Sequence, residues 1–123
     1  MLLVKTKIGL SKIHGIGLFA DQFIPRGTPI WKFMPDFDLE IDENQLAKFP
    51  EIAKEYFLKY SYLDLKTKKH ILCSDDARFS NHSENPNITS DKKEEIDIAG
   101  RDISKGEELT YDYKEFCYDF DVK

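Results

Sequence analysis

The amino-acid sequence predicts a mostly β fold with short helices in a central insert, and three observations lead to this prediction. Short runs of bulky and β-branched residues recur along the 123-residue chain, with turn-forming residues between them. Apolar residues at helical spacing are confined to residues 41–60, and no segment of the chain repeats. A chain of this length forms one domain with a single modest core, which we place at residues 1–123.

The first part of the chain contains three predicted strands. Residues 3–8 alternate loosely between apolar and polar side chains and form the first strand. A turn-rich connection at residues 9–17 leads to a buried strand at residues 18–20. The prolines and glycine of residues 25–29 predict a turn, and a short bulky strand follows at residues 30–34.

Two helices are predicted in the middle of the chain. The first begins near residue 41, where Asp42 can cap the helix and Gln45 occupies the capping-box position. Pro50 suits the first turn of the second helix, which continues to about residue 60. Helical spacing predicts one apolar face on this second helix, packed in the core: Ile52, Ala53, Tyr56, Phe57 and Tyr60.

The remaining predicted elements are strands. Residues 60–65 and 70–73 form a hairpin around a lysine-rich turn. Two more short strands are expected at residues 95–100 and 109–111, with a lysine–glycine turn between them.

Composition and charge narrow the partners that we expect. A net charge of −5 argues against direct nucleic-acid binding, which needs a clustered positive surface. The apolar start of residues 1–4 is too short for a signal peptide or a membrane span, so we expect no membrane contact. With only two cysteines, a reducing cytoplasmic setting in a bacterial-type cell is expected, or a host cell if the protein is viral or secreted without a signal.

Two polar segments gather the groups that could carry chemistry. Residues 78–87 read R-F-S-N-H-S-E-N-P-N, and residues 106–113 read G-E-E-L-T-Y-D-Y. Amides and imidazoles are costly to bury, so such groups usually have a ligand or each other as partners. Near the N-terminus, residues 14–20 contain a G-x-G, which by itself indicates only a tight turn. It lacks the third glycine of a dinucleotide fingerprint and the lysine of a phosphate loop.

Together these segments resemble the paired signature of the SET-domain protein lysine methyltransferases. In that family the motifs are R-F-x-N-H-x-x-x-P-N and G-E-E-L-T-Y/F-D-Y, with a G-x-G close to the N-terminus. The resemblance covers residues 7–113 and implies the β-clip SET fold, in which the two motifs cross in a knot-like arrangement. It also implies that residues 38–60 are the variable insert and residues 114–123 a C-terminal tail.

The resemblance implies an S-adenosyl-L-methionine site. The asparagine amide of Asn81 would meet the ammonium and carboxylate end of this methyl donor, and His82 would lie beside its adenine. Arg78 would assist at that end or hold the loop, and we favour the loop. The candidate cofactor-binding residues are Gly15, Ile16, Gly17, Arg78, Asn81 and His82.

The resemblance also implies that Tyr113 is the catalytic tyrosine. A lysine amine must be neutral to accept a methyl group, and presenting it neutral at pH 7 costs roughly 4–5 kcal/mol. An apolar channel and the positive sulfonium lower the lysine pKa, and a tyrosine hydroxyl can orient the amine. Tyr111 stands where the family has phenylalanine or tyrosine, and tyrosine there tends to limit the product. We therefore predict mainly monomethylation, with dimethylation as the second possibility.

The walls of the lysine channel are predicted from the same resemblance. Phe33, Tyr62 and Phe116 are the candidates, although many members of the family have tyrosine at the place of Phe33. The tail contains only Cys117, so the zinc cluster of many nuclear members is not expected, and no metal is predicted. This minimal build resembles the short bacterial and viral members of the family.

Two other readings stay open at this point. The chain can be a catalytically silent SET-like module that binds a peptide or a partner protein, or the same scaffold can serve a different, sugar-like ligand. The sequence favours the enzyme, whose substrate would be a lysine-bearing protein. The oligomeric state is open, and a homodimer is one alternative.

Overall fold

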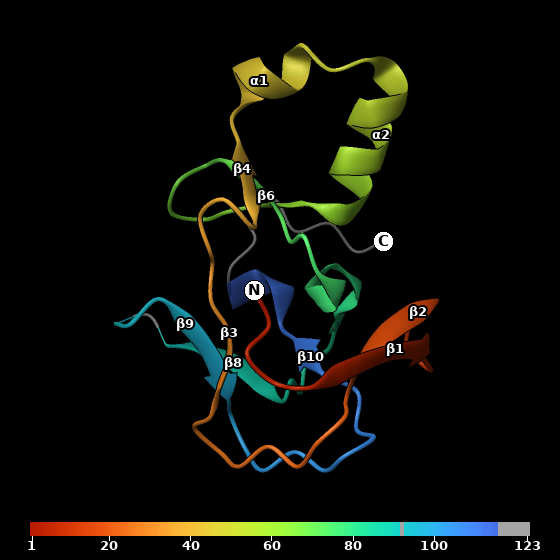
Figure 1. The fold of residues 1–123 in the computed structure, drawn as a ribbon, viewed down its shortest axis with the longest axis vertical. Helices are drawn as coiled ribbons and strands as arrows, with labels where there is room; N and C mark the ends of the chain where they lie inside the picture. Colours follow the sequence, from red (N-terminus) through yellow and green to blue (C-terminus); the bar gives the residue numbers. More distant parts are fainter. Residues whose placement is uncertain (92, 116–123) are drawn as a thin grey trace.

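The computed structural model describes residues 1–91 and 93–115, and this part of the chain consists mainly of short strands (Figure 1). The prediction of a mostly β fold with two helices in the middle is confirmed. In Figure 1 the helices gather at one end of the molecule, and most of the strands lie at the other end. No helix in the described part of the chain is long and apolar enough to cross a membrane.

The first two strands form an antiparallel hairpin. Strand β1 (Thr6–Leu10) pairs with β2 (Ile16–Ala20), and Gly9 lies opposite Gly17. The predicted turn-rich connection at residues 9–17 is therefore shorter in the structure, because its first two and last two residues belong to the strands. The two glycines face each other across the ladder, so the extended pairing continues through them instead of turning.

A second sheet has the order β3-β9-β8 and is antiparallel throughout. Its strands are β3 (Pro29–Trp31), β9 (Ile96–Ala99) and β8 (Ile88–Asp91). The first two agree with predicted strands, whereas β8 was not predicted. In β3 the predicted strand over residues 30–34 is shorter and ends at Trp31.

The third sheet carries the helices and has β6 (His70–Leu72) between β4 (Leu39–Ile41) and β5 (Tyr62–Leu63). The predicted hairpin of β5 and β6 is confirmed, and β4 is an additional edge strand.

Helix α1 (Glu43–Ala47) begins as its capping pattern predicts. The backbone N–H of Gln45 donates to Asp42 Oδ1 at 2.8 Å, and the Asp42 N–H donates to Gln45 Oε1 at 2.9 Å. This reciprocal pair satisfies two of the free N–H groups at the helix start. The local sequence alone was therefore sufficient to predict where this helix begins.

Helix α2 (Glu51–Tyr60) has the predicted bounds but not the predicted core face. Phe57 is buried, whereas Ile52 is 83% exposed and Tyr56 is 51% exposed. The prediction was wrong because the helix meets only a small core, made of Ile41, Leu46, Phe57 and Leu72. A core of that size contacts Phe57 and Tyr60, which lie about one turn apart, and leaves Ile52 and Tyr56 at the surface.

The two motifs meet through a short parallel pair of strands. Strand β7 (Asn81–His82) pairs with β10 (Thr110–Tyr111), with Tyr111 opposite His82. Short 3-10 turns flank the pair, η1 (Asp76–Phe79) before β7 and η2 (Tyr113–Glu115) after β10. The main core packs beneath them, and its fully buried large side chains include Leu18, Ile24, Ile30, Ile88, Ile103 and Leu109.

Candidate functional site

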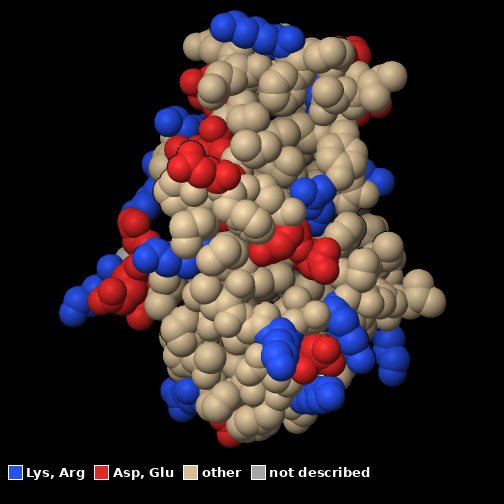
Figure 2. Space-filling view, in the orientation of Figure 1, with Lys and Arg blue, Asp and Glu red and all other residues tan. Residues whose placement is uncertain are grey.

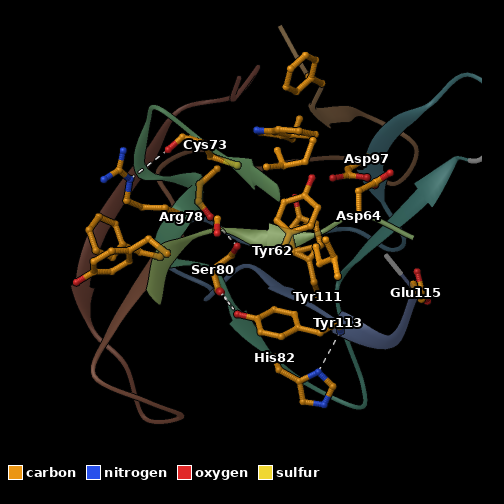
Figure 3. A pocket seen from close by; sticks show the side chains of 18 of the residues that line it. Tyr62, Asp64, Cys73, Arg78, Ser80, His82, Asp97, Tyr111, Tyr113 and Glu115 are labelled. Carbon is orange, nitrogen blue, oxygen red and sulfur yellow. Dashed lines mark hydrogen bonds between the residues drawn. The ribbon is translucent and has the colours of Figure 1, made fainter. Parts of the chain in front are cut away.

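One large cavity of about 1260 Å³ brings most of the predicted site residues together (Figure 3). Its lining includes Gly15, Ile16, Phe33, Tyr62, Arg78, Asn81, His82, Tyr111 and Tyr113. Gly17 is not among the lining residues. Phe116, the remaining channel candidate, lies outside the described residues.

The Asn81 side chain joins the first motif to the G-x-G loop. Its Nδ2 donates to the carbonyl of His14 at 3.1 Å, to that of Ile16 at 3.4 Å and to Glu108 Oε2 at 3.0 Å. The amide nitrogen is therefore used within the protein. Asn81 Oδ1 has no hydrogen-bond partner among residues 1–91 and 93–115, which leaves an acceptor for a ligand.

Glu108 is a site residue that the sequence analysis did not identify. Its two carboxylate oxygens each lie 2.9 Å from Ser11 Oγ, so it binds the loop from the opposite side. The contact also accounts for the glycine at position 17, because a Cβ there would lie 2.5 Å from Glu108 Oε2. Glu108 thus fixes the G-x-G loop, and Gly17 provides the space for that carboxylate.

Asn87 connects the two motifs inside the core. It is 1% exposed, accepts a hydrogen bond from the Thr110 N–H at 2.8 Å and donates to the Glu108 carbonyl at 2.7 Å. The Asn87 Nδ2 also donates to Glu107 Oε2 at 3.0 Å. All of these partners belong to the second motif, so Asn87 holds the motifs together and does not face the cavity.

Arg78 holds its loop and the second helix. Its Nε donates to the Cys73 carbonyl at 3.2 Å, and a terminal nitrogen donates to the Tyr56 hydroxyl at 2.6 Å. The guanidinium also lies 6.0 Å from the centre of the Tyr60 ring. These contacts agree with the loop-holding alternative for Arg78, and they occupy two of its nitrogens.

Tyr113 and His82 lie against each other at one wall of the cavity. The Tyr113 hydroxyl donates to the Ser80 carbonyl, and the two aromatic rings meet edge to face at 5.4 Å (Figure 3). The hydroxyl proton of Tyr113 is therefore donated within the protein.

Tyr111 lines the same cavity and is 8% exposed. Its hydroxyl forms a side-chain hydrogen bond with the Asp97 carboxylate. Burial, together with the Asp97 charge, raises the pKa of Tyr111 well above its usual value. The phenol therefore stays protonated and donates to Asp97.

The histidine and the cysteine on or beside β6 have different surroundings. His70 Nε2 lies 2.6 Å from Glu43 Oε1, and burial raises the pKa of the Cys73 thiol to about 12. In the part of the chain that the structure describes, no group of three or more His, Cys, Asp or Glu side chains is arranged to hold a metal ion.

Charged side chains of both signs are mixed on the face shown in Figure 2. Lysine and arginine alternate there with aspartate and glutamate and do not form one positive patch. The acidic residues at the cavity include Glu40, Asp64, Asp91, Glu95, Asp97 and Glu115.

Comparison with known proteins identifies the family to which this arrangement belongs. The SET domain family model matches residues 15–114, a span that includes both glycines of the G-x-G and both polar motifs. The chain therefore belongs to the SET-domain family, as its motifs indicated.

Curated relatives carry the same domain within much longer chains. Human histone-lysine N-methyltransferase 2D is 33% identical over 121 residues, which cover 90% of this chain and 2% of the relative. The H3 lysine-36 specific histone-lysine N-methyltransferase of Schizosaccharomyces pombe is 35% identical over 124 residues, covering 89% of this chain and 14% of the relative. The chain thus spans only a small part of these proteins.

Solved structures agree in fold at lower identity. A provisionally assigned histone methyltransferase of Plasmodium falciparum is 22% identical with a TM-score of 0.61, covering 91% of this chain and 95% of that chain. A humanized mutant of the Chaetomium thermophilum Polycomb Repressive Complex 2, bound to an inhibitor, is 21% identical with a TM-score of 0.65. That match covers 94% of this chain and 16% of the solved one.

Proposed function

We propose that this protein transfers a methyl group from S-adenosyl-L-methionine to the side-chain amine of a lysine in another protein. The observation that carries the proposal is that one cavity is lined by residues of the G-x-G loop, by Asn81 and His82, and by Tyr111 and Tyr113. Family membership and the names of the relatives support the same reaction.

The residues around the G-x-G loop fit the amino-acid end of such a methyl donor. Asn81 Oδ1 accepts no hydrogen bond from the residues that the structure describes, and the Glu108 carboxylate beside the Asn81 amide adds negative charge. Both features suit an ammonium group at the cavity. Gly15 leaves open space beside the loop, because a Cβ there would meet no atom within 4 Å. When bound, S-adenosyl-L-methionine supplies a methyl group on a positive sulfonium.

Tyr113 would orient the lysine amine during transfer. Its hydroxyl oxygen can accept a hydrogen bond from the amine because its own proton is donated to the Ser80 carbonyl. The ring is held by the contact with His82, so the oxygen occupies a fixed position. Such alignment, together with exclusion of water by the aromatic walls, would supply most of the rate enhancement.

The neutral lysine amine that the reaction needs would form by desolvation. Phe33, Tyr62 and Trp31 line the cavity and provide an apolar wall, which lowers the pKa of an ammonium ion that enters it. The proton then leaves to solvent before transfer, and no strong general base is required. After transfer, the new N–C bond replaces the S–C bond and the sulfur keeps the electron pair as a neutral thioether.

The product and the partners follow from the same site. The Tyr111 hydroxyl stands in the wall of the cavity, and we assign it a role in holding the number of methyl groups mainly to one. The substrate would be a lysine-bearing protein, met in the cytoplasm of a bacterial-type cell or in a host cell.

Calorimetric titration with S-adenosyl-L-methionine tests the cofactor site. The native protein should bind, and Asn81→Ala should bind at least about tenfold more weakly, since a charged hydrogen bond is worth roughly 1.5–3 kcal/mol. Asn85→Ala is the matched control, because Asn85 is an exposed asparagine of the same segment. Absence of binding to the folded native protein would refute the enzyme and favour a module that binds peptides or partners.

A further inference from the structure

Lys66 lies at the open side of the cavity, in the turn between β5 and β6. Its side chain belongs to the cavity lining and is 71% exposed, so the ammonium group reaches solvent. Lys59 is the other lysine in the described lining, and its Nζ lies 5.3 Å from the centre of the Tyr60 ring, at the end of helix α2. Lys66 instead projects from a turn. The candidate methylation site therefore has a lysine of its own chain at its mouth.

The turn that carries Lys66 is organised by Asp64. The Asp64 carboxylate accepts hydrogen bonds from the backbone N–H groups of Lys66 at 3.1 Å and Thr67 at 2.9 Å. Such a turn fixes the backbone while its side chains stay outside the packed core. Lys66, Lys68 and Lys69 are all exposed here, so the turn presents a short basic segment to solvent.

Glu95 holds the Lys66 ammonium group in the present arrangement. Lys66 Nζ lies 2.5 Å from Glu95 Oε1, and Glu95 belongs to the turn between β8 and β9. Both residues line the cavity and both are exposed, so the pair crosses the open side of the cavity. The hydrogen bond to Glu95 and the Glu95 charge raise the pKa of Lys66. Lys66 must therefore leave Glu95 before its amine can become neutral and accept a methyl group.

We propose that Lys66 is itself a substrate of this protein and is methylated by a second copy of the chain. The proposal rests on the proposed methyl transfer and names one protein substrate for it. Within one molecule the Lys66 side chain starts in the wall of the cavity and ends on Glu95, so it does not enter from outside as a substrate lysine would. In a second copy the exposed turn is free to enter the cavity with Lys66 leading.

The charges of the two surfaces are complementary. Asp91, Glu95 and Glu115 make the cavity wall acidic, and Figure 3 shows Asp97 and Glu115 on one side of the pocket. Asp97 accepts a hydrogen bond from Ser90 Oγ at 3.0 Å and adds to the negative charge of this wall. Because the basic turn adjoins the acidic wall, a two-fold arrangement would place each turn against the wall of the other copy. Opposite charges favour such an encounter.

The methylation of Lys66 is the same balanced reaction as for any protein lysine. After Lys66 leaves Glu95, Nζ loses a proton to solvent and its lone pair forms the new N–C bond. The S–C bond of the donor breaks, and the sulfur keeps the electron pair. Monomethylated Lys66 is again an ammonium ion at neutral pH and has two N–H groups, so it can return to Glu95.

Mass spectrometry on a mixture of two proteins tests the proposal. Tyr113→Phe protein labelled with ¹⁵N is incubated with unlabelled native protein and S-adenosyl-L-methionine, and Lys66 of each isotopic form is analysed. The labelled Lys66 should become methylated, because the native protein acts on a second copy. Lys66→Arg in the labelled protein should abolish the methylation of this turn. Lys59→Arg, the matched control at the same cavity, should leave Lys66 methylation within about twofold.

Two results would overturn the proposal while leaving the proposed function intact. One is methylation of Lys66 in the unlabelled chains alone, which would mean that each chain modifies itself. The other is an unmethylated Lys66 in a reaction that methylates core histones or lysine peptides. No methylation of any of these proteins or peptides would instead refute the proposed function, and this proposal with it.

Glu95 provides a second test, because it competes for the Lys66 amine. Glu95→Gln is introduced into the labelled Tyr113→Phe protein alone, so the cavity of the native enzyme is unchanged. Its Lys66 should be methylated about threefold faster, since an exposed ion pair changes an equilibrium by about this factor. Glu94→Gln is the control, because Glu94 is an exposed glutamate of the same turn that is not among the lining residues. Equal rates for Glu95→Gln and Glu94→Gln would overturn the proposed release of Lys66 from Glu95.

Discussion

The backbone N–H of Tyr113 donates a hydrogen bond to Nδ1 of His82 at 3.1 Å. This contact joins the end of the second motif to the first motif, 31 residues earlier in the chain. With the Tyr113 hydroxyl bonded to the Ser80 carbonyl, the tyrosine is held at its backbone and at its tip by the same segment. The position of the phenol oxygen in the cavity is therefore set by the fold before any ligand binds.

Asn87→Ala should destabilise the protein by about 3 kcal/mol, because it leaves the buried Thr110 N–H and Glu108 carbonyl without partners. The free energy of unfolding from urea titration checks this value. Asn85→Ala, an exposed neighbour, should change it by less than about 0.5 kcal/mol. A similar small effect of both substitutions would mean that Asn87 does not hold the motifs together.

Gly17→Ala should weaken S-adenosyl-L-methionine binding by about tenfold, because the new methyl group displaces the Glu108 carboxylate and loosens the loop. Gly9→Ala serves as the control, since a Cβ there makes only an ordinary contact of 3.5 Å with the Phe19 ring. Calorimetry on both variants provides the comparison. Unchanged affinity in Gly17→Ala would show that the packing of Gly17 against Glu108 is not needed for the site.

Asp97→Asn should be more stable than the native protein at neutral pH. The pKa of Asp97 is about 6 in the folded protein and 3.8 for an ordinary aspartate, so the folded state binds the proton more tightly. Ionisation of Asp97 therefore costs stability, and this cost develops as the pH rises from about 4 to about 6. The gain in Asp97→Asn should be on the order of 1–3 kcal/mol at about pH 7.5 and should shrink by that amount at about pH 4.

Urea unfolding of the native protein and Asp97→Asn at both pH values measures this difference. A gain that does not depend on pH would contradict the raised pKa of Asp97. A less stable variant at neutral pH would show that the hydrogen bonds from Ser90 and Tyr111 outweigh the cost of burying the charge.

Arg78→Lys should distinguish a structural role from cofactor binding. Lysine cannot reach the Cys73 carbonyl and the Tyr56 hydroxyl together, so the unfolding free energy should fall by about 1 kcal/mol. Affinity for S-adenosyl-L-methionine should change by less than about twofold, which is within about 0.4 kcal/mol. A large loss of affinity with unchanged stability would instead show that Arg78 takes part in cofactor binding.

The features that the sequence predicted well depend on neighbouring residues. The capping box of α1 needs only Asp42 and Gln45, and the β5–β6 hairpin needs only two short runs around a turn. The buried face of α2 was predicted to be too wide, because periodicity cannot reveal how small the facing core is. Ile52 was therefore wrongly assigned to the core.

The candidate site residues were proposed from motif resemblance, and the residues that support them in the structure were not identified from the sequence. Glu108 binds Ser11 across 97 residues, a pairing that no local pattern reveals. Asp97 lies between two isoleucines along the strand. Such an alternation ordinarily places the apolar side chains inward and the carboxylate in solvent. The structure has Asp97 on the side of the buried Ala99, because the sheet of β3, β9 and β8 turns that face to the cavity wall.

The most direct test of the central claim is transfer of a labelled methyl group from S-adenosyl-L-methionine to protein lysine, compared between native protein and Tyr113→Phe. The native protein should methylate lysine in core histones or in a lysine peptide pool, and Tyr113→Phe should be slower by about 100-fold, because it loses the group that orients the amine. Tyr56→Phe, whose ring lies outside the cavity lining, should stay within about threefold of native. Equal rates in native protein and Tyr113→Phe, or no lysine methylation by native protein that binds the cofactor, would contradict the account.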